Sequence, residues 1–358
     1  MYCSPRFTSL QYAAVNTVGC NELEVFVREM EKFPLNEPVD VKPVVLAACA
    51  NMFMQYMCST SFPYDDKDFR KIVRDFDEIF WEINQGYAVD FLPWLLPMYS
   101  KHMSKLSLWA ANIREFILAR IVQDHVKTLD YHAPPRDFTD ALLIHLQEDP
   151  NMEWQHIIFE LEDFIGGHSA IGNLVMMVLA NVVKYPEIAA KIQEEVDSVT
   201  NYGQRYVDLF DKEAMPYTEA VLWETLRKGS SPIVPHVAST DTDIEGFPIK
   251  RGTMIFLNNY ELNLSPEYWD DPEQFKPERF ISASGTVVKP AHFIPFSTGK
   301  RTCIGQRLVQ CFSFIIISTL LQKYDISPGS EIKIKPSCVA VAPDCFKLIL
   351  KTRNKNQN

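Results

Sequence analysis

Hydrophobic and polar positions recur with a helical period over most of the first 230 residues. Residues 67–85 place apolar side chains three and four positions apart among Asp, Arg and Glu, which predicts an amphipathic helix. The same reasoning predicts helices over residues 21–33, 44–58, 101–129, 151–184, 186–199 and 216–228, and one more that starts at Arg136. Pro34 and Pro186 follow two of these patterns and mark where the helices end.

The pattern changes after residue 230, where short β-like runs lie between turn residues. These runs cover residues 234–238, 248–250 and 253–258, and a strongly apolar helix is predicted over 303–323. Residues 331–352 alternate like a hairpin with its turn near 342–344. We therefore predict a mainly α protein with a small β part, forming a single domain over residues 1–358. Its helical body spans 1–230 and its β-rich part spans 231–358.

One apolar stretch has two possible roles, and a second suggests a place where a ligand approaches. Residues 91–99 are apolar but broken by Pro93 and Pro97, so they form either a packed loop or an exposed lid or membrane-contacting surface. Gly166 and Gly167 interrupt the middle of the longest helical pattern, which suggests a local opening where a ligand approaches. No stretch reaches the roughly 18 apolar residues of a membrane span, and residues 44–58 come nearest. We interpret that stretch as a core helix.

Composition narrows the classes of function. The chain has 358 residues, 47% of them hydrophobic, and a net charge of −11, which argues against nucleic acid as the main partner. Its eight cysteines show no Cys-x-x-Cys pair and no zinc-finger spacing, so they are expected to be reduced, mostly buried thiols of a cytosol-facing protein. The first residues lack the apolar core of a signal peptide.

The most distinctive chemistry lies in residues 293–305. Cys303 precedes an apolar helix, whose free N–H groups and dipole stabilise a thiolate. Gly299 and Gly305 allow a flat group to approach the backbone, Phe296 can pack against it, and Arg301 can donate to an anion. A lone cysteine in a turn is more often structural, so the spacing of its neighbours decides between the two interpretations.

Two further patterns are weak when taken alone. Glu224 and Arg227 lie three positions apart on one helix face, and Arg279 follows in a Pro-Glu-Arg-Phe segment. His236 ends a Pro-Ile-Val-Pro-His stretch. A Glu-x-x-Arg pair is common on solvated helices, and a lone histidine is more often a satisfied surface or core residue than a ligand contact.

Together these patterns resemble the cytochrome P450 family over nearly the whole chain. The segment Phe-x-x-Gly-x-Arg-x-Cys-x-Gly matches the haem-thiolate loop of that family. The resemblance implies haem as the cofactor and Cys303 as the thiolate ligand of its iron, with Phe296, Arg301, Gly305 and His236 as cofactor-binding residues. It also implies a network of Glu224, Arg227 and Arg279 behind the loop, and it places Ile233 and Val234 against the substrate.

The chain departs from the family pattern in two places. The family's membrane anchor, its first β-sheet region and a Trp-x-x-x-Arg helix precede the segment that residues 4–7 resemble, so we expect a cytochrome P450 fold without those parts. On the oxygen-side helix, Ser169 stands where the family has an acid and Ala170 where it has a threonine. Gly167, Ser169 and Ala170 are therefore the candidate catalytic positions, with His168 as a possible proton relay. The sequence Gly-Gly-His-Ser-Ala at residues 166–170 resembles that of insect ecdysteroid-synthesising members of the Spook type.

The resemblance implies a monooxygenase that inserts one oxygen atom of O2 into a hydrophobic substrate, such as a sterol or ecdysteroid precursor. NADPH-cytochrome P450 reductase would supply electrons at a basic surface including Lys300 and Arg307. The full-length form would lie on the cytosolic face of the endoplasmic reticulum membrane. Two alternatives stay open: a haem-thiolate isomerase or dehydratase that needs no such proton relay, and an inactive truncated fragment.

Overall fold

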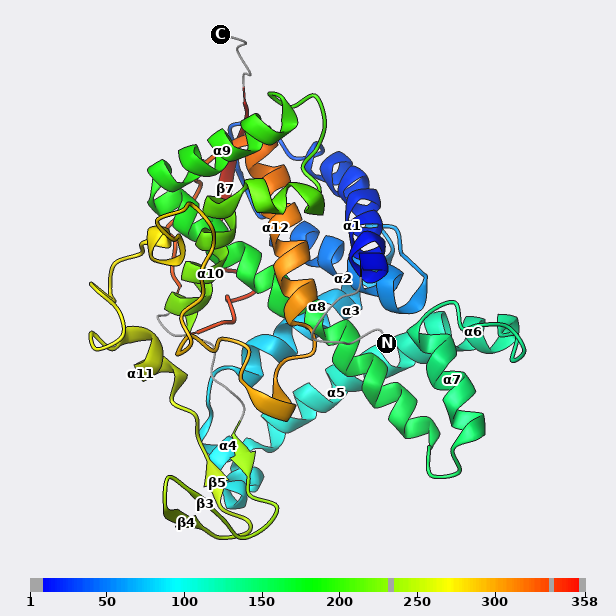
Figure 1. Ribbon diagram of the computed structural model, residues 1–358. Helices are drawn as coiled ribbons and strands as arrows, with labels where there is room; N and C mark the ends of the chain where they lie inside the picture. Colours follow the sequence, from blue (N-terminus) through cyan, green and yellow to red (C-terminus); the bar gives the residue numbers. More distant parts are fainter. Residues whose placement is uncertain (1–8, 231–234, 335–337, 354–358) are drawn as a thin grey trace.

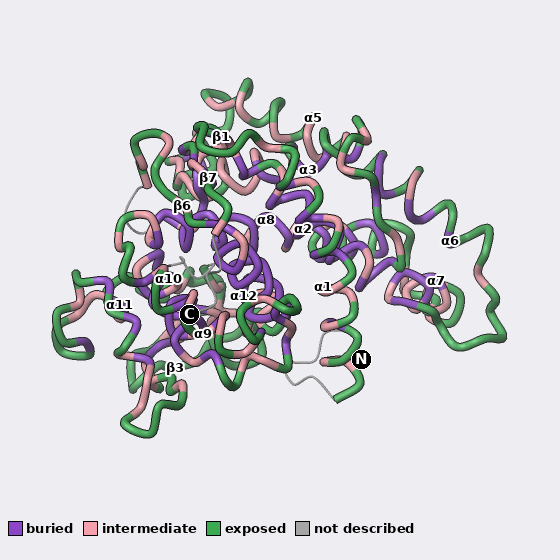
Figure 2. The backbone as a smooth tube through the Cα atoms, turned by 90° about the horizontal axis from the view of Figure 1, so that it is seen from above, coloured by how far each residue is buried: buried purple, intermediate pink, exposed green. Residues whose placement is uncertain are grey.

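The computed structural model describes residues 9–230, 235–334 and 338–353, and it is mainly helical with three small sheets. Helix α8, at Trp154–Lys184, runs through the centre of the molecule (Figure 1). It packs against α2, α10 and α12, and the burial map shows these helices largely enclosed while α6 lies at the periphery (Figure 2). The prediction of a mainly α fold with a small β part is confirmed.

The helices of the first 230 residues follow the hydrophobic pattern closely. Their bounds are α1 Ser9–Met30, α2 Lys42–Cys58, α3 Lys67–Ile83, α4 Ala88–Phe91, η1 Pro93–Tyr99, α5 Ser100–Ile117, η2 Leu118–Val122, α6 Gln123–Thr128, α7 Phe138–Glu148, α8 Trp154–Lys184, α9 Pro186–Thr200, η3 Leu209–Ala214 and α10 Pro216–Gly229. The predicted helix 21–33 was wrong at its start, because α1 begins twelve residues earlier, at Ser9.

Local sequence explains where several helices begin. The side chain of Asp66 accepts hydrogen bonds from the backbone N–H groups of Asp68 and Phe69 and so caps α3. Asp137 caps α7 in the same way, through the N–H of Asp140. Pro43 occupies the first turn of α2, where its missing N–H costs nothing.

The later part contains short elements around one long helix. They are α11 Asn259–Leu264, η4 Pro277–Phe280, η5 Gly299–Arg301 and α12 Gln306–Lys323, with strands β1 Pro38–Val39, β2 His236–Val237, β3 Thr242–Ile244, β4 Phe247–Ile249, β5 Met254–Ile255, β6 Tyr324–Pro328 and β7 Leu348–Thr352. β2 pairs with β5 and β3 pairs with β4, all antiparallel.

The predicted hairpin over residues 331–352 was wrong. β7 pairs antiparallel with β6, which ends before residue 331, and with β1 from the N-terminal part of the chain, in the order β1-β7-β6. In this pairing Tyr324 lies opposite Thr352 and Pro328 opposite Leu348, so the partner of β7 is a strand that lies before the predicted hairpin.

The apolar stretches of the chain differ in how far they are buried. Residues 91–99 are not a packed loop, because Trp94 is 71% and Met98 80% exposed. The paired glycines open nothing, since α8 continues through Gly166 and Gly167 without a break. α8 is itself long and apolar enough to cross a membrane, but 78% of its most apolar window is buried, so it is a core helix of this fold.

Glycine in α8 instead permits close packing between helices. A Cβ built on Gly172 would lie 2.5 Å from a methyl carbon of Leu46, too close for two carbon atoms that are not bonded to each other. This position therefore lets α8 and α2 approach each other, and their contact forms part of the main core.

Candidate functional site

A cavity of about 800 Å³ lies between α8, α3, α10 and the loop that carries Cys303. Its walls are largely apolar, and the candidate residues Ala170, His236, Phe296, Arg301 and Cys303 are all part of them. The other lining residues are Phe80, Ile83, Asn84, Leu174, Met177, Leu226, Pro235, Val237, Pro295, Ser297, Val309 and Val339. The structure thus brings together residues that are more than 130 positions apart in the sequence.

Cys303 lies just before α12 and is part of the lining of this cavity. Its backbone N–H donates to the carbonyl of Phe296 over 2.8 Å, which closes the loop on itself. Burial raises the pKa of the Cys303 thiol, while hydrogen bonds from the backbone N–H groups of Gly305 and Gln306 oppose that rise. A cation held against this sulfur would favour the thiolate further. The predicted helix start at residue 303 was three residues early, because α12 begins at Gln306 and Cys303 lies in the turn before it.

The loop before the cysteine turns sharply through two left-handed positions. Gly299 has φ +70° and Ser297 has φ +63°. The hydroxyl of Thr302 donates to the carbonyl of Phe296 over 3.2 Å and supports the same turn. A residue with a Cβ is strained at the φ of Gly299, which gives this glycine a conformational reason to be there.

His236 and Arg301 give the cavity its polar rim. His236 pairs with Ile255 between β2 and β5, and its buried Nδ1 has no hydrogen-bond partner among the described residues. Arg301 is exposed and adds a guanidinium to the lining. An unsatisfied buried nitrogen and a guanidinium in the lining of one cavity suit the carboxylates of a ligand.

This set of residues fits haem. Cys303 offers one sulfur atom at a cavity with apolar walls formed in part by Leu174, Met177 and Leu226, and His236 and Arg301 offer nitrogen atoms for carboxylate groups. A thiolate is the soft ligand that haem iron accepts in this class of site. Ile233 and Val234, predicted to face the substrate, lie outside the described residues.

Behind the loop, Glu224, Arg227 and Arg279 meet in one buried cluster. Glu224 and Arg227 are both 0% exposed and form a two-point pair with distances of 2.7 Å. The Nε of Arg279 lies 3.2 Å from the same carboxylate. Arg227 also donates to the backbone carbonyls of Asn263 and Pro272, over 2.6 and 2.8 Å. The network therefore ties α10 to the irregular segment that leads towards the cysteine loop.

An aromatic cluster connects that network with the loop itself. Trp269 lies over the guanidinium of Arg227, 5.1 Å from ring centroid to carbon, and packs edge-on against Phe293. Trp223 of α10 contacts both Phe293 and Phe296. Phe280, the last residue of the Pro-Glu-Arg-Phe segment, is fully buried and completes the cluster.

On the central helix, Ala170 faces the cavity but its candidate neighbours do not line it. A Cβ on Gly167 would lie 3.1 Å from the ring of Phe53, so this glycine faces α2. The Oγ of Ser169 is 3.5 Å from Nε2 of His168, and both residues are buried. Burial lowers the pKa of His168 to about 4, which makes the ring neutral near pH 7.

Sequence reasoning missed a buried polar network that holds three walls of the cavity. Lys42 of α2 lies 2.6 Å from Asp77 of α3, and Asp77 accepts from Asn173 of α8 over 2.9 Å. The amide oxygen of Asn173 accepts the N–H of Val341 over 2.7 Å, two residues after the lining residue Val339. An asparagine in the apolar run after Ala170 was the available signal.

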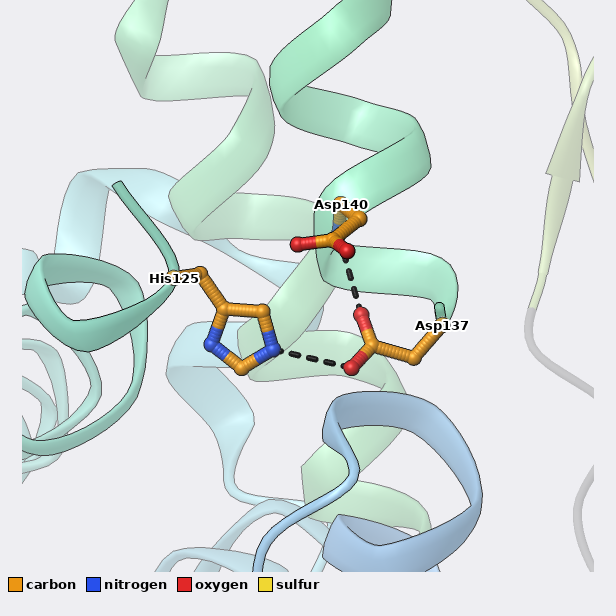
Figure 3. A group of neighbouring side chains, drawn as sticks. All are labelled: His125, Asp137 and Asp140. Atoms are coloured by element: carbon orange, nitrogen blue, oxygen red, sulfur yellow. Dashed lines mark hydrogen bonds and ion pairs between the residues drawn. The ribbon is translucent and has the colours of Figure 1, made fainter. Parts of the chain in front are cut away.

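A second cluster has metal-ligand chemistry but already uses its atoms. His125, Asp137 and Asp140 bring ligand atoms within 4.8 Å of one another (Figure 3). Asp137 accepts from His125 and also caps α7, while Asp140 forms a two-point pair with Arg136. Because these atoms already have partners, we interpret the cluster as a structural link between α6 and α7 rather than as a metal site.

Comparisons with known proteins agree with the chemistry of the main cavity. The family model "Cytochrome P450" matches residues 2–350. Cytochrome P450 307a1 of Drosophila melanogaster is 48% identical over 99% of this chain and 70% of its own length. Cytochrome P450 2J5 of Mus musculus is 33% identical over 83% of the chain, and Cytochrome P450 1A2 of Homo sapiens is 30% identical over 82%. The chain spans 60% and 58% of the lengths of these two mammalian relatives.

Proposed function

Because the chain belongs to the cytochrome P450 family of haem-thiolate iron proteins, we propose that it acts as a monooxygenase on a hydrophobic substrate. The recognition of the family and of haem as its cofactor is confirmed. In the proposed reaction one atom of O2 enters a C–H bond of the substrate and the other leaves as water, with two electrons and two protons consumed. The observation that carries the proposal is Cys303, held at the cavity wall by backbone N–H groups of Gly305 and Gln306.

Each candidate residue has a proposed role. Cys303 binds the iron as a thiolate, Phe296 forms part of the surface on which the cofactor lies, and Gly305, which does not line the cavity, donates its N–H to the sulfur. Arg301 and His236 donate to its carboxylates. Haem, when bound, supplies the oxygen activation and redox chemistry that side chains lack. Glu224, Arg227 and Arg279 act through the loop as positioning residues.

The cavity favours an apolar substrate of considerable size. Phe80, Ile83, Leu174 and Val339 line the cavity together with Ala170 and make much of its surface apolar. We propose a sterol or ecdysteroid precursor, on the basis of the Gly-Gly-His-Ser-Ala sequence of α8 and the similarity to the Drosophila relative.

The test is turnover of a sterol panel by the haem-loaded chain with NADPH and a flavin reductase. We expect a product that contains one atom from isotope-labelled O2 and is absent without reductase. Loss of turnover in Cys303→Ala, with the substrate still bound, is also expected. A product that carries oxygen from water would contradict the proposal.

A second reaction is favoured by one observation, the methyl group of Ala170 in the cavity wall. Ala170 cannot hold or move a proton, and Ser169 and His168 do not line the cavity. A haem-thiolate isomerase or dehydratase would need neither O2 nor reductase. Product formation in their absence would therefore select this reaction over monooxygenation.

Electron supply and location are proposed from surface residues. NADPH-cytochrome P450 reductase would dock at the exposed surface around Lys300 and Arg307, near the cysteine loop. Trp94 and Met98, which are strongly exposed, would contact the cytosolic face of the endoplasmic reticulum membrane. Flotation with vesicles tests this contact, and an unchanged bound fraction for Trp94→Glu/Met98→Glu would contradict it.

A further inference from the structure

A second large cavity lies between α1, α2 and α3, outside the site described above. Its volume is about 690 Å³, and it shares no lining residue with the cavity that contains Cys303. The three helices lie next to one another in the blue and cyan part of the chain (Figure 1). This volume falls in the range of about 300–1,000 Å³ that is typical of small-molecule sites.

The charge of this cavity is opposite to that of the whole chain. Six cationic and three anionic side chains line it, a net charge of +3 in a chain of net charge −11. The cations are Lys32, Lys42, Lys67, Arg70, Lys71 and Arg74, and the anions are Glu29, Asp65 and Asp77. Two of the anions are already paired, Glu29 with Lys32 at 2.7 Å and Asp77 with Lys42 at 2.6 Å.

The remaining four cations form one exposed face of α3. Positions 67, 70, 71 and 74 are three, four and seven residues apart, so their side chains lie on the same side of the helix. No carboxylate of the described residues lies within 4.0 Å of any of the four. Like charges at this spacing repel one another, and a bound anion would relieve that repulsion.

Apolar side chains line the same cavity. Phe33, Val44, Leu46, Ala47 and Pro343 belong to this apolar part, together with Tyr64, and all of them lie outside α3. The α1 and α2 side also carries Lys32 and Lys42, but both are paired with carboxylates. A cavity lined by unpaired cations and by apolar side chains is suited to a molecule that has both an anionic group and a hydrocarbon body. Inorganic phosphate alone would leave the apolar part in contact with water.

We propose that this second cavity binds a small anionic amphiphile, a phosphate or sulfate ester of a hydrocarbon. The anionic group lies against Lys67, Arg70, Lys71 and Arg74, and the hydrocarbon lies against Val44 and Phe33. The proposal does not rest on the monooxygenase activity, since it concerns other residues and another cavity.

The test is isothermal titration calorimetry of the purified full chain with decyl phosphate below its micelle concentration. We expect saturable binding that weakens as salt is added, because the contact is charged and exposed. Arg70→Glu/Arg74→Glu should lower the affinity at least tenfold. The matched control Lys101→Glu/Arg251→Glu changes the net charge equally at exposed sites outside the cavity and should keep the affinity.

Further titrations distinguish the contribution of the anionic group to binding from that of the hydrocarbon. Inorganic phosphate and decyltrimethylammonium should bind at least tenfold more weakly than decyl phosphate. Val44→Trp fills space beside the apolar residues and leaves the charge unchanged. It should lower the affinity for decyl phosphate. Equal affinity of the wild type and Arg70→Glu/Arg74→Glu would overturn the proposal, and so would equal affinity for inorganic phosphate. If the charge reversal prevents folding, Arg70→Gln/Arg74→Gln and Val44→Trp decide the question by the same criteria.

Discussion

The indole ring of Trp223 packs edge-on against the ring of Phe296, with 6.2 Å between their centroids. Trp223 lies in α10 directly before Glu224. Phe296 lies in the cysteine loop, and its carbonyl accepts the N–H of Cys303. One aromatic contact therefore connects the buried ion-pair network with the sulfur at the cavity wall. The position of Cys303 depends on packing as well as on backbone hydrogen bonds.

Trp223→Ala should loosen this connection. Removal of a large aromatic side chain from a packed cluster typically costs about 3–5 kcal/mol. We expect a loss of that order in the free energy of unfolding, measured with urea, and a smaller share of thiolate-ligated haem in the folded fraction. Trp223→Phe keeps a ring in place and serves as the control. A fully stable Trp223→Ala with unchanged haem ligation would show that the contact does not position the loop.

Arg227→Gln should be among the most destabilising single changes in the chain. It leaves the carboxylate of Glu224, which is 0% exposed, without its two-point partner. Breaking a buried ion pair on one side costs about 3–5 kcal/mol. Lys250→Gln breaks an exposed pair with Asp241 and should cost less than about 1 kcal/mol. Chemical denaturation compares the two, and equal losses would be inconsistent with the network described here.

The buried network was predictable because its residues lie within short motifs. Glu224 and Arg227 share one helix turn, and Arg279 belongs to a tetrapeptide. Each pattern is weak alone, but together with the cysteine loop they resemble a known family, and that resemblance implied the network. Helix bounds such as Lys42–Cys58 and Lys67–Ile83 were likewise within reach, since the hydrophobic period and the caps are local.

What the sequence did not reveal depends on contacts between distant segments. β7 pairs with β6 and β1, and nothing in the alternation of residues 331–352 indicates those partners. The pair formed by Lys42 and Asp77 joins two helices across 35 positions, and beside Pro43 the lysine has the pattern of an ordinary helix start. Gly167 was taken for a ligand opening because the ring of Phe53 that faces it comes from another helix.

Glu22 should make stability depend on pH between its two pKa values. Burial raises the pKa of Glu22 from 4.5 to about 7, against the opposing hydrogen bonds from Tyr64, Asn51 and Gln55. The folded state therefore holds a proton that the unfolded state releases, so stability is full below pH 4.5 and falls as the pH rises towards 7. The shift corresponds to about 3 kcal/mol.

Glu22→Gln removes this titrating group. We expect a clearly shallower fall in the free energy of unfolding across that pH window, measured by urea denaturation, whereas exposed Glu24→Gln on the same helix should keep the slope of the wild type. The full wild-type slope in Glu22→Gln would assign the pH dependence to other groups.

His125 should stabilise the contact between α6 and α7 on the acid side of neutrality (Figure 3). Burial lowers the pKa of His125, but its hydrogen bonds to Asp137 and to the carbonyl of Ile121 outweigh burial and leave the pKa above 6.5. With the folded pKa raised, the contribution is complete below pH 6.5 and is lost as the pH rises through the folded value. His125→Gln should therefore lower the melting temperature more in acid than in alkaline buffer. An equal decrease at both would contradict a charged pair with Asp137.

The central claim is that Cys303 holds haem iron as a thiolate in this cavity. The most direct measurement is the difference spectrum of the haem-loaded, reduced chain with and without carbon monoxide, compared between the wild type and Cys303→Ala. We predict a Soret band at the position characteristic of thiolate-ligated haem in the wild type, and its loss in Cys303→Ala while Cys311→Ala keeps it. A wild-type spectrum without that band, or the same band in Cys303→Ala, would contradict the account.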